Sequence, residues 1–244
     1  MTIRVLVNGV KGRMGREVSG TFRDDPELEL VGGTDLGDDL AAALSESGAQ
    51  VAVDFTVAGS GYTNAKTMIA AGVCPVIGTS GIQPGEVSDL ENLCREKALG
   101  GVIAPNFAIG AVLMMRFAAE AARHLPHVEI IELHHDRKVD APSATAVKTA
   151  QMIEAVRPKA PPPKVEETEL APGARGTRSY PVIIHSVRLP GLVAHQEVIL
   201  GGIGETLTVR HDSISRESFM SGVTLAVKRV MKLDELVYGL ENLL

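Results

Sequence analysis

A glycine-rich loop near the start of the chain sets the strongest limit on its fold. The apolar run 3–7 predicts a strand, a helical pattern follows, and a GxxGxxG loop at 9–15 separates the two. In such a loop the first glycine allows a tight turn, the second lets a pyrophosphate approach the backbone, and the third lets the helix contact the strand. The next predicted strand, 28–34, leads into Asp35, where an acid that binds ribose hydroxyls is expected. A glycine-rich turn in an unrelated α/β protein is the alternative that this pattern leaves open.

The alternation of strands and helices continues to about residue 107. Strands are predicted at 50–54, 73–77 and 102–104, and helices at 62–71 and 84–97. Ligands of open α/β sheets bind outside the carboxyl ends of the strands, so the segments after these strands are expected to line one crevice with the glycine loop. The residues predicted to bind a dinucleotide are Gly9, Val10, Lys11, Gly12, Arg13, Met14, Asp35, Gly78, Thr79, Ser80, Ala104, Pro105, Asn106 and Phe107.

The pattern after residue 107 predicts a second, α+β region. A helix at 109–124, a strand at 128–133 and a helix from 144 to about 156 lead into a proline-rich, exposed connection at 157–164. Strands then follow at 182–187, 194–200 and 205–210, separated by turn residues that are typical of an antiparallel meander.

The last part of the chain predicts a return to the first region. The run 216–231 predicts a helix, and the amphipathic tail could fold back on the first domain. We therefore expect an α/β Rossmann-type parallel-sheet domain formed by 1–107 and 213–244. The second domain, 108–212, is expected to be α+β with a mixed, largely antiparallel sheet.

The composition agrees with this architecture and argues against several functional classes. Hydrophobic residues make up 45% of the chain but aromatic residues only 3%, so the cores must be aliphatic, as in parallel sheets covered by helices. The formal net charge of −6 argues against a general nucleic-acid surface. No apolar run reaches membrane-spanning length, no signal peptide is recognised, and Cys74 and Cys94 lack motif spacing. A cytoplasmic protein without nucleic-acid or membrane partners is therefore expected.

The stretch 129–146 concentrates polar side chains where a predicted strand gives way to a helix. Two histidines, an arginine, a lysine and two aspartates lie between 134 and 140. If this backbone is extended, His134 and Lys138 share a face and His135 points away. If it forms a helical turn, His134 and Lys138 are i, i+4 neighbours. Either geometry places a proton-transfer group beside a cation, although a solvated charged loop after an edge strand would look similar. A metal site is not expected, because adjacent histidines on a strand diverge and no HExxH motif is present.

Short motifs along the whole chain resemble the dihydrodipicolinate reductase family. They are Gly9-Val-Lys-Gly-Arg-Met-Gly15, Val53-Asp-Phe-Thr56, Gly78-Thr-Ser-Gly81, Ala104-Pro-Asn-Phe107, Glu132-Leu-His-His135, Lys138-Val-Asp-Ala-Pro-Ser143, Val187-Arg-Leu-Pro-Gly191 and Gly204-Glu-Thr-Leu207. The resemblance implies an NAD(P)H-binding Rossmann domain and a substrate domain whose mixed sheet builds a homotetramer. It also implies reduction of a small dicarboxylate ring, 4-hydroxy-tetrahydrodipicolinate, in the diaminopimelate route to lysine.

The resemblance also implies roles for the polar residues after the strand at 128–133. His134 would be the catalytic acid/base, Lys138 would donate a proton or hold the substrate, and His135 would contact the substrate. Hydride transfer to C4 of the dehydrated ring would be followed by protonation of C3. A histidine, with an ordinary pKa near 6.5, suits proton delivery around neutral pH.

The family holds a substrate carboxylate with a Ser-Gly-Thr step, which in this chain is Ser143-Ala144-Thr145. A Cβ at the middle position would be strained if that residue required a positive φ. If the residue merely begins a helix, its N–H group still faces the anion. The helical pattern that follows favours the second interpretation.

Two other functions fit parts of the sequence less well. Another Rossmann reductase of the aspartate-semialdehyde type would need a catalytic cysteine, and neither Cys74 nor Cys94 lies in a suitable loop. A nucleotide-binding regulator without catalysis would give no reason for the pairing of His134 and Lys138. For the cofactor, Asp35 favours NADH while Lys11 could accept the phosphate of NADPH, so both are expected to work.

Overall fold

The computed structural model describes residues 2–158, 165–166, 168–180 and 182–244. The chain forms two compact units. The first unit comprises Met1–Ile109 and Arg216–Leu244, and the second comprises Gly110–Ser215. The proline-rich connection expected at 157–164 lies mostly outside the described residues.

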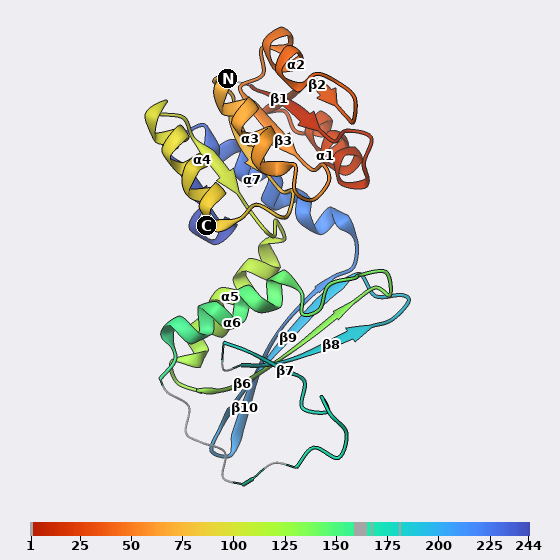
Figure 1. Cartoon of the computed structure of the whole chain (residues 1–244), viewed down its shortest axis with the longest axis vertical. Helices are drawn as coiled ribbons and strands as arrows, with labels where there is room; N and C mark the ends of the chain where they lie inside the picture. The colour runs from red at the N-terminus through yellow and green to blue at the C-terminus, as the bar shows by residue number, and fades with distance from the viewer. Residues whose placement is uncertain (1, 159–164, 167, 181) are drawn as a thin grey trace. The chain divides into compact units, whose positions relative to one another are not determined.

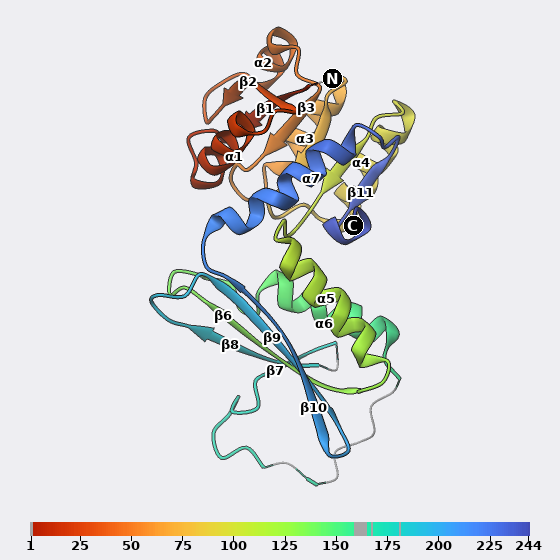
Figure 2. The ribbon, with the colours of Figure 1, turned by 180° about the vertical axis from the view of Figure 1, so that it is seen from behind.

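In the described part of the chain, the first unit is built on a six-stranded parallel sheet in the order β11-β5-β4-β3-β1-β2 (Figure 1). The strands are β1 (Ile3–Asn8), β2 (Leu28–Thr34), β3 (Val51–Asp54), β4 (Cys74–Ile77), β5 (Gly101–Ile103) and β11 (Leu236–Tyr238). One face is covered by α1 (Arg13–Asp24) and α7 (Met220–Val230), and the other by α2 (Leu40–Ser47), α3 (Gly61–Ala70) and α4 (Pro84–Glu96) (Figures 1 and 2). Helices on both faces of a parallel sheet confirm the predicted Rossmann-type fold.

Burial on both faces explains the aliphatic composition of these strands. Val5, Leu6 and Val7 are consecutive residues of β1, so their side chains alternate between the two faces, yet all three are buried. Short strands of this kind appear in the sequence as continuous apolar runs.

Two elements of the first unit were not predicted. Helix α2 is short, and it is held by its ends: the Asp39 side chain accepts a hydrogen bond from the Ala42 N–H group (3.1 Å), and Gly48 ends the helix with a φ of 59°. The amphipathic tail forms β11, which pairs in parallel with β5 and buries Leu236. A three-residue edge strand gives too short a pattern to be recognised in advance.

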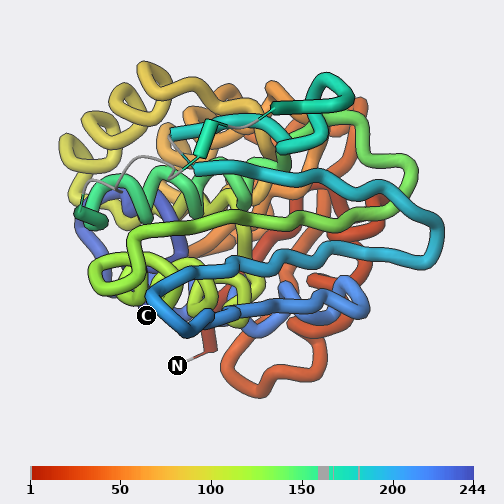
Figure 3. The backbone as a smooth tube through the Cα atoms, turned by 90° about the horizontal axis from the view of Figure 1, so that it is seen from below, coloured from red at the N-terminus to blue at the C-terminus, as the bar shows by residue number. Residues whose placement is uncertain are grey.

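Among the described residues, the second unit contains a five-stranded mixed sheet in the order β10-β9-β6-β8-β7 (Figure 3). Its elements are α5 (Ile109–Ala122), β6 (His127–His134), α6 (Ala144–Val156), β7 (Thr177–Ser179), β8 (Val182–Arg188), β9 (Ala194–Gly202) and β10 (Glu205–Ser213). Helix α6 packs against β6 and β8. The mixed sheet agrees with the predicted fold class.

The simple meander expected for 182–210 is wrong. Strand β6 lies between β8 and β9, pairing in parallel with β8 and antiparallel with β9 (Figure 3). Of the three strands expected in the meander, only β9 and β10 therefore pair with each other as a hairpin. The inserted strand buries Val128 and Ile130 on one face. A central position in the sheet buries these side chains, whereas an edge position would expose them.

Candidate functional site

The glycine loop after β1 has the close backbone contacts that a pyrophosphate-binding turn needs. Gly9 has a φ of 87°, and its N–H group donates to the Thr34 carbonyl oxygen (2.8 Å). A Cβ on Gly15 would lie 2.1 Å from the Gly9 oxygen, whereas a Cβ on Gly12 would meet its nearest neighbour, the same oxygen, at 3.1 Å. Gly9 and Gly15 are therefore required by the fold of the loop itself. Gly12 leaves its outer side open for a ligand.

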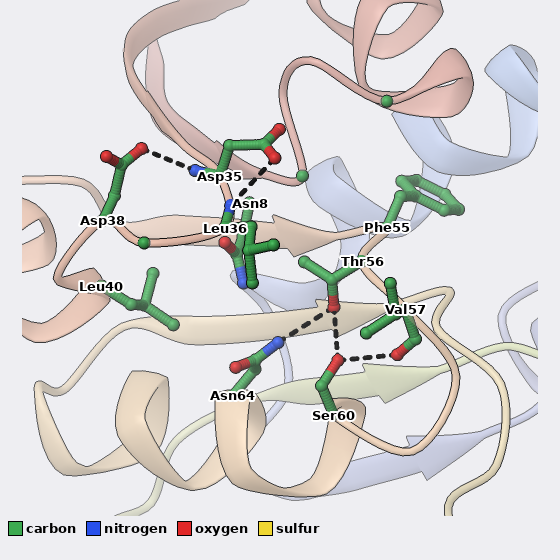
Figure 4. A pocket seen from close by; sticks show the side chains of 13 residues that line it. Asn8, Asp35, Leu36, Asp38, Leu40, Phe55, Thr56, Val57, Ser60 and Asn64 are labelled. Atoms are coloured by element: carbon green, nitrogen blue, oxygen red, sulfur yellow. Dashed lines mark hydrogen bonds between the residues drawn. The ribbon is translucent and has the colours of Figure 1, made fainter.

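A cavity of about 420 Å³ lies at the carboxyl ends of the first unit's strands (Figure 4). Cavities of this size hold small ligands. The lining comprises Asn8, Gly9, Gly12, Asp35, Leu36, Gly37, Asp38, Leu40, Phe55, Thr56, Val57, Ser60 and Asn64. The structure thus brings together the glycine loop, the acid after β2 and the segment after β3, as the sequence predicted.

Asp35 is held in place by the loop that it faces. Its carboxylate accepts hydrogen bonds from the backbone N–H groups of Leu36 (2.9 Å) and Lys11 (2.8 Å), and these bonds hold its pKa below the usual range. Its own N–H group donates to Asp38 (2.8 Å), which also lines the cavity. Two acidic side chains therefore stand on this wall, and the Leu36 side chain close to them is fully exposed (Figure 4).

A network of polar side chains forms the floor of the cavity. The Asp54 side chain is 0% exposed and accepts hydrogen bonds from the side-chain amides of Asn8 (3.1 Å) and Asn64 (3.3 Å). Burial raises the pKa of the Asp54 carboxyl, although hydrogen bonds from Thr56 and Asn64 oppose this. Asn64 also donates to Thr56, whose hydroxyl shares a hydrogen bond with Ser60 (Figure 4). Asn8, Ser60 and Asn64 were not predicted, because single amides and hydroxyls carry no recognisable spacing.

The other two segments predicted to bind the dinucleotide, 78–80 and 104–107, do not line this cavity. The Thr79 hydroxyl accepts a hydrogen bond from the Thr56 N–H group (2.9 Å). A Cβ on Gly78 would lie 2.2 Å from the ring of Phe55, and that ring makes an edge contact with Phe107 at 5.7 Å between centroids. Segments 78–80 and 104–107 thus support the side chains that form the wall.

The polar stretch of the second unit begins at the end of β6. His134 is the last residue of that strand, and the backbone then turns, with the Lys138 N–H group donating to the His135 oxygen (3.2 Å). The stretch is therefore neither extended nor helical. The Lys138 ammonium group bonds both carboxylate oxygens of Asp140 (2.7 Å each), and this ion pair holds the pKa of Asp140 below its usual range.

Hydrogen bonds connect His134 to Lys138 through other side chains. The His134 Nδ1 atom lies 2.6 Å from Glu132, which also accepts hydrogen bonds from Arg188. Arg188 in turn donates to the Asp140 backbone oxygen (2.8 Å). Sequence analysis gave Glu132, Asp140 and Arg188 no role. The signal for Arg188 was its place in the Val187–Gly191 motif, which the parallel pairing of β6 and β8 brings opposite His134.

The N-terminus of α6 completes this group. Ser143 caps the helix by accepting a hydrogen bond from the Ala146 N–H group (3.2 Å), and Ala144 is the first helical residue. Ala144 is not among the residues with positive φ, so the helical interpretation of this position is the correct one. The first-turn N–H groups, those of Ala144 and Thr145 included, give this helix end a partial positive charge that favours an anion.

No group of three or more histidine, cysteine, aspartate or glutamate side chains among the described residues is arranged to hold a metal ion. None of the helices found in the described ranges has the length and apolar character needed to cross a membrane.

Comparison with known proteins identifies the family. Residues 3–107 match the family described as "Dihydrodipicolinate reductase, N-terminus", and residues 110–244 match "Dihydrodipicolinate reductase, C-terminus". The 4-hydroxy-tetrahydrodipicolinate reductase of Streptococcus gordonii is 52% identical over 255 residues, and that of Coxiella burnetii is 49% identical over 244 residues, with full coverage of both chains in each case. A solved structure of dipicolinate-bound dihydrodipicolinate reductase from Paenisporosarcina sp. TG-14 is 43% identical, with a TM-score of 0.90 and full coverage of both chains. The chain therefore belongs to the dihydrodipicolinate reductase family.

Proposed function

We propose that this protein reduces 4-hydroxy-tetrahydrodipicolinate to tetrahydrodipicolinate and water with NADH or NADPH, in the diaminopimelate pathway to lysine. The observation that carries the proposal is the cluster at the end of β6, where His134, Lys138 and the N-terminus of α6 are linked by hydrogen bonds in a chain of this family. A bound nicotinamide supplies the hydride.

The residues of the first unit fit a pyridine dinucleotide. The open side of Gly12 leaves room for a pyrophosphate at the start of α1, where backbone N–H groups favour negative charge. The Asp35 carboxylate, held by two backbone N–H groups, is placed to accept hydrogen bonds from ribose hydroxyls. We assign residues 1–107 and 213–244 to dinucleotide binding.

The residues of the second unit fit a dicarboxylate and a proton transfer. His134 is the proposed acid/base that delivers a proton to C3 of the ring. Lys138 holds a substrate carboxylate or assists that delivery, and His135 contacts the ring. The step Ser143-Ala144-Thr145 offers the backbone N–H groups of α6 to a substrate carboxylate, because a helix N-terminus attracts anions. Positive groups placed here also stabilise negative charge that develops during reduction. We assign 108–212 to substrate binding and to assembly of a homotetramer.

The acid/base role is tested by an assay in which freshly generated substrate is mixed with NADH and the nicotinamide absorbance is followed. His134→Ala should lower kcat about 10²–10⁴-fold, the usual contribution of a positioned acid or base. The matched control is His185→Ala. Like His134, His185 is paired with a glutamate of β6, but its partner is Glu129 and not Glu132. The control should keep wild-type kcat. An unchanged kcat in His134→Ala would remove this residue from the mechanism.

We further propose that the protein uses both cofactors but prefers NADH. Asp35 and Asp38 would repel a 2′-phosphate, and the side chain between them, Leu36, has no charge to offset this. The ratio of kcat/KM for NADH to that for NADPH should fall about tenfold or more in Asp35→Asn, since one repelled charge corresponds to at least about 1.4 kcal/mol.

The control for cofactor choice is Asp39→Asn. Asp39 is a neighbouring acid that caps α2 and does not line the cavity. Asp39→Asn should keep the wild-type ratio of kcat/KM for NADH to that for NADPH. If Asp35→Asn also kept this ratio, Asp35 would be excluded as the source of the preference for NADH.

A further inference from the structure

One buried carboxylate of the second unit has no role in the chemistry described so far. Glu132 lies in the central strand β6, two residues before His134, and its side chain is 0% exposed. Its cross-strand neighbours are Ser186 on β8 and Gln196 on β9. The Gln196 side chain donates to Thr149 of α6, so this row of polar side chains faces that helix. A carboxylate is rarely buried so completely unless it is paired.

Each oxygen of Glu132 has two donors. Oε1 accepts hydrogen bonds from the Arg188 guanidinium (2.8 Å) and from the Ser143 N–H group (3.1 Å). Oε2 accepts from the same guanidinium (2.8 Å) and lies 2.6 Å from His134 Nδ1. Burial raises the pKa of Glu132, but hydrogen bonds from His134, Arg188 and Ser186 more than offset this and lower it to about 2. The side chain is therefore an anion throughout the physiological pH range.

This anion decides which nitrogen of His134 carries a proton. A carboxylate can only accept, so the Nδ1 atom must donate to it, and the neutral ring then has its other nitrogen, Nε2, unprotonated. The Arg188 guanidinium bonds both oxygens at once, so the carboxylate cannot rotate away from the ring.

The same carboxylate also fixes the start of α6. The Ser143 N–H group that it accepts belongs to the cap residue of that helix. One side chain thus connects the proposed proton donor, at the end of β6, with the proposed carboxylate-binding backbone of 143–145. A shift of either group would break a bond to Glu132.

We infer that Glu132 is a positioning residue for the reaction: it holds His134 with the proton on Nδ1 and keeps the ring at a fixed position relative to the N-terminus of α6. The inference rests on the proposed function of His134. The charged groups around this site are Arg188 on β8, His134 on β6 and the Lys138–Asp140 pair in the loop, while Gln196 on β9 is neutral.

The chain offers a matched control on the same strand. Glu129 is also paired with an arginine, Arg175 (2.5 Å), and with a histidine, His185 (2.8 Å). Two residues lie between it and Glu132 along β6, so the two side chains lie on opposite faces of the sheet. Glu129→Gln therefore removes the same chemical group from an equivalent ion pair, away from the proposed site.

The kinetic experiment compares Glu132→Gln, Glu129→Gln and wild type. Glu132→Gln should lower kcat about 10–100-fold, as the loss of a supporting hydrogen bond does at other sites, with KM for NADH unchanged. Glu129→Gln should match wild type in both kcat and KM. A merely structural role would change the amount of folded protein, which circular dichroism measures, and would leave the kcat of the folded fraction unchanged.

Nitrogen NMR of histidine in the wild-type protein tests the position of the ring proton directly. The signals of His134, assigned by their loss in His134→Gln, should show the proton on Nδ1 in the neutral ring. A ring protonated on Nε2, or a Glu132→Gln variant with wild-type kcat, would overturn the inference. Absence of turnover by wild type would refute the proposed function instead, and the NMR result would still decide whether Glu132 fixes the ring.

Discussion

Ala144 occupies a position at which the backbone does not require glycine. Glycine is needed where φ is positive, but among the described residues the only non-glycine residues with positive φ are Ala98 and Tyr180. Ala144 instead begins α6, where any residue can offer its backbone N–H group. The Cβ does not alter the direction of that group.

Ala144→Gly should therefore change the substrate KM less than about threefold, since the backbone donor is retained. The variant should lose at most about 1 kcal/mol in the free energy of unfolding, because glycine has a lower helix propensity than alanine. Urea denaturation and steady-state kinetics check the two values. A tenfold decrease of KM in the variant would show that the Cβ obstructs the substrate.

Glu132 also links stability to pH. Its pKa in the folded protein is about 2, against an ordinary value of 4.5, so its contribution is fully present above about pH 4.5 and is lost as the pH falls toward 2. The difference in unfolding free energy between wild type and Glu132→Gln should narrow by about 1 kcal/mol from about pH 7 to about pH 3.5. Urea denaturation of both proteins at each pH measures this difference. A constant difference would mean that the carboxylate titrates alike in the folded and unfolded chain.

At the scale of elements, the glycines in the turn from β1 to α1 have different roles. Gly9 and Gly15 are required by the fold of the loop, whereas Gly12 is required by the proposed ligand. Gly12→Ala should weaken NADH binding at least tenfold, because its Cβ would stand at the proposed pyrophosphate position. That Cβ would also lie 3.1 Å from the Gly9 oxygen, a tight contact that the loop must relieve by a small shift. Gly20→Ala, in the same helix, is the control: a Cβ there meets nothing within 4 Å. It should keep the affinity and raise the unfolding free energy by about 0.5–1 kcal/mol. Fluorescence titration with NADH would contradict the assignment if both variants bound equally well.

Most elements could be predicted because their patterns are local. The range of β2 was predicted without error, and α6 begins at the expected residue. Strand order is not local: the position of β6 between β8 and β9 depends on which faces are buried together, so the meander was wrong. Contacts in the site between residues that are far apart in the sequence could not be predicted for the same reason. The glycine loop and His134 follow from short motifs, whereas Arg188 reaches Glu132 only through the pairing of β6 with β8, 56 residues along the chain.

At the scale of the whole molecule, the two proposed binding regions belong to different units. NADH alone should slow amide hydrogen exchange mainly at residues 8–15, 35–40 and 55–64 of the first unit, which line or adjoin the cavity. Dipicolinate, the ligand of the Paenisporosarcina structure, should add protection at 132–145 of the second unit. Mass spectrometry of peptides resolves these segments. Protection of 132–145 by NADH in the absence of dipicolinate would show that the two regions do not respond separately.

The first unit is discontinuous in sequence, and this has a consequence for its biosynthesis. Residues 110–215 leave the ribosome before α7 covers the parallel sheet and before β11 pairs with the edge of β5. We expect a nascent chain arrested before Arg216 to be cut by protease within residues 1–109 faster than within 110–215, and resistance in both parts would contradict this. The half of the protein that is translated first would then be the half that folds last.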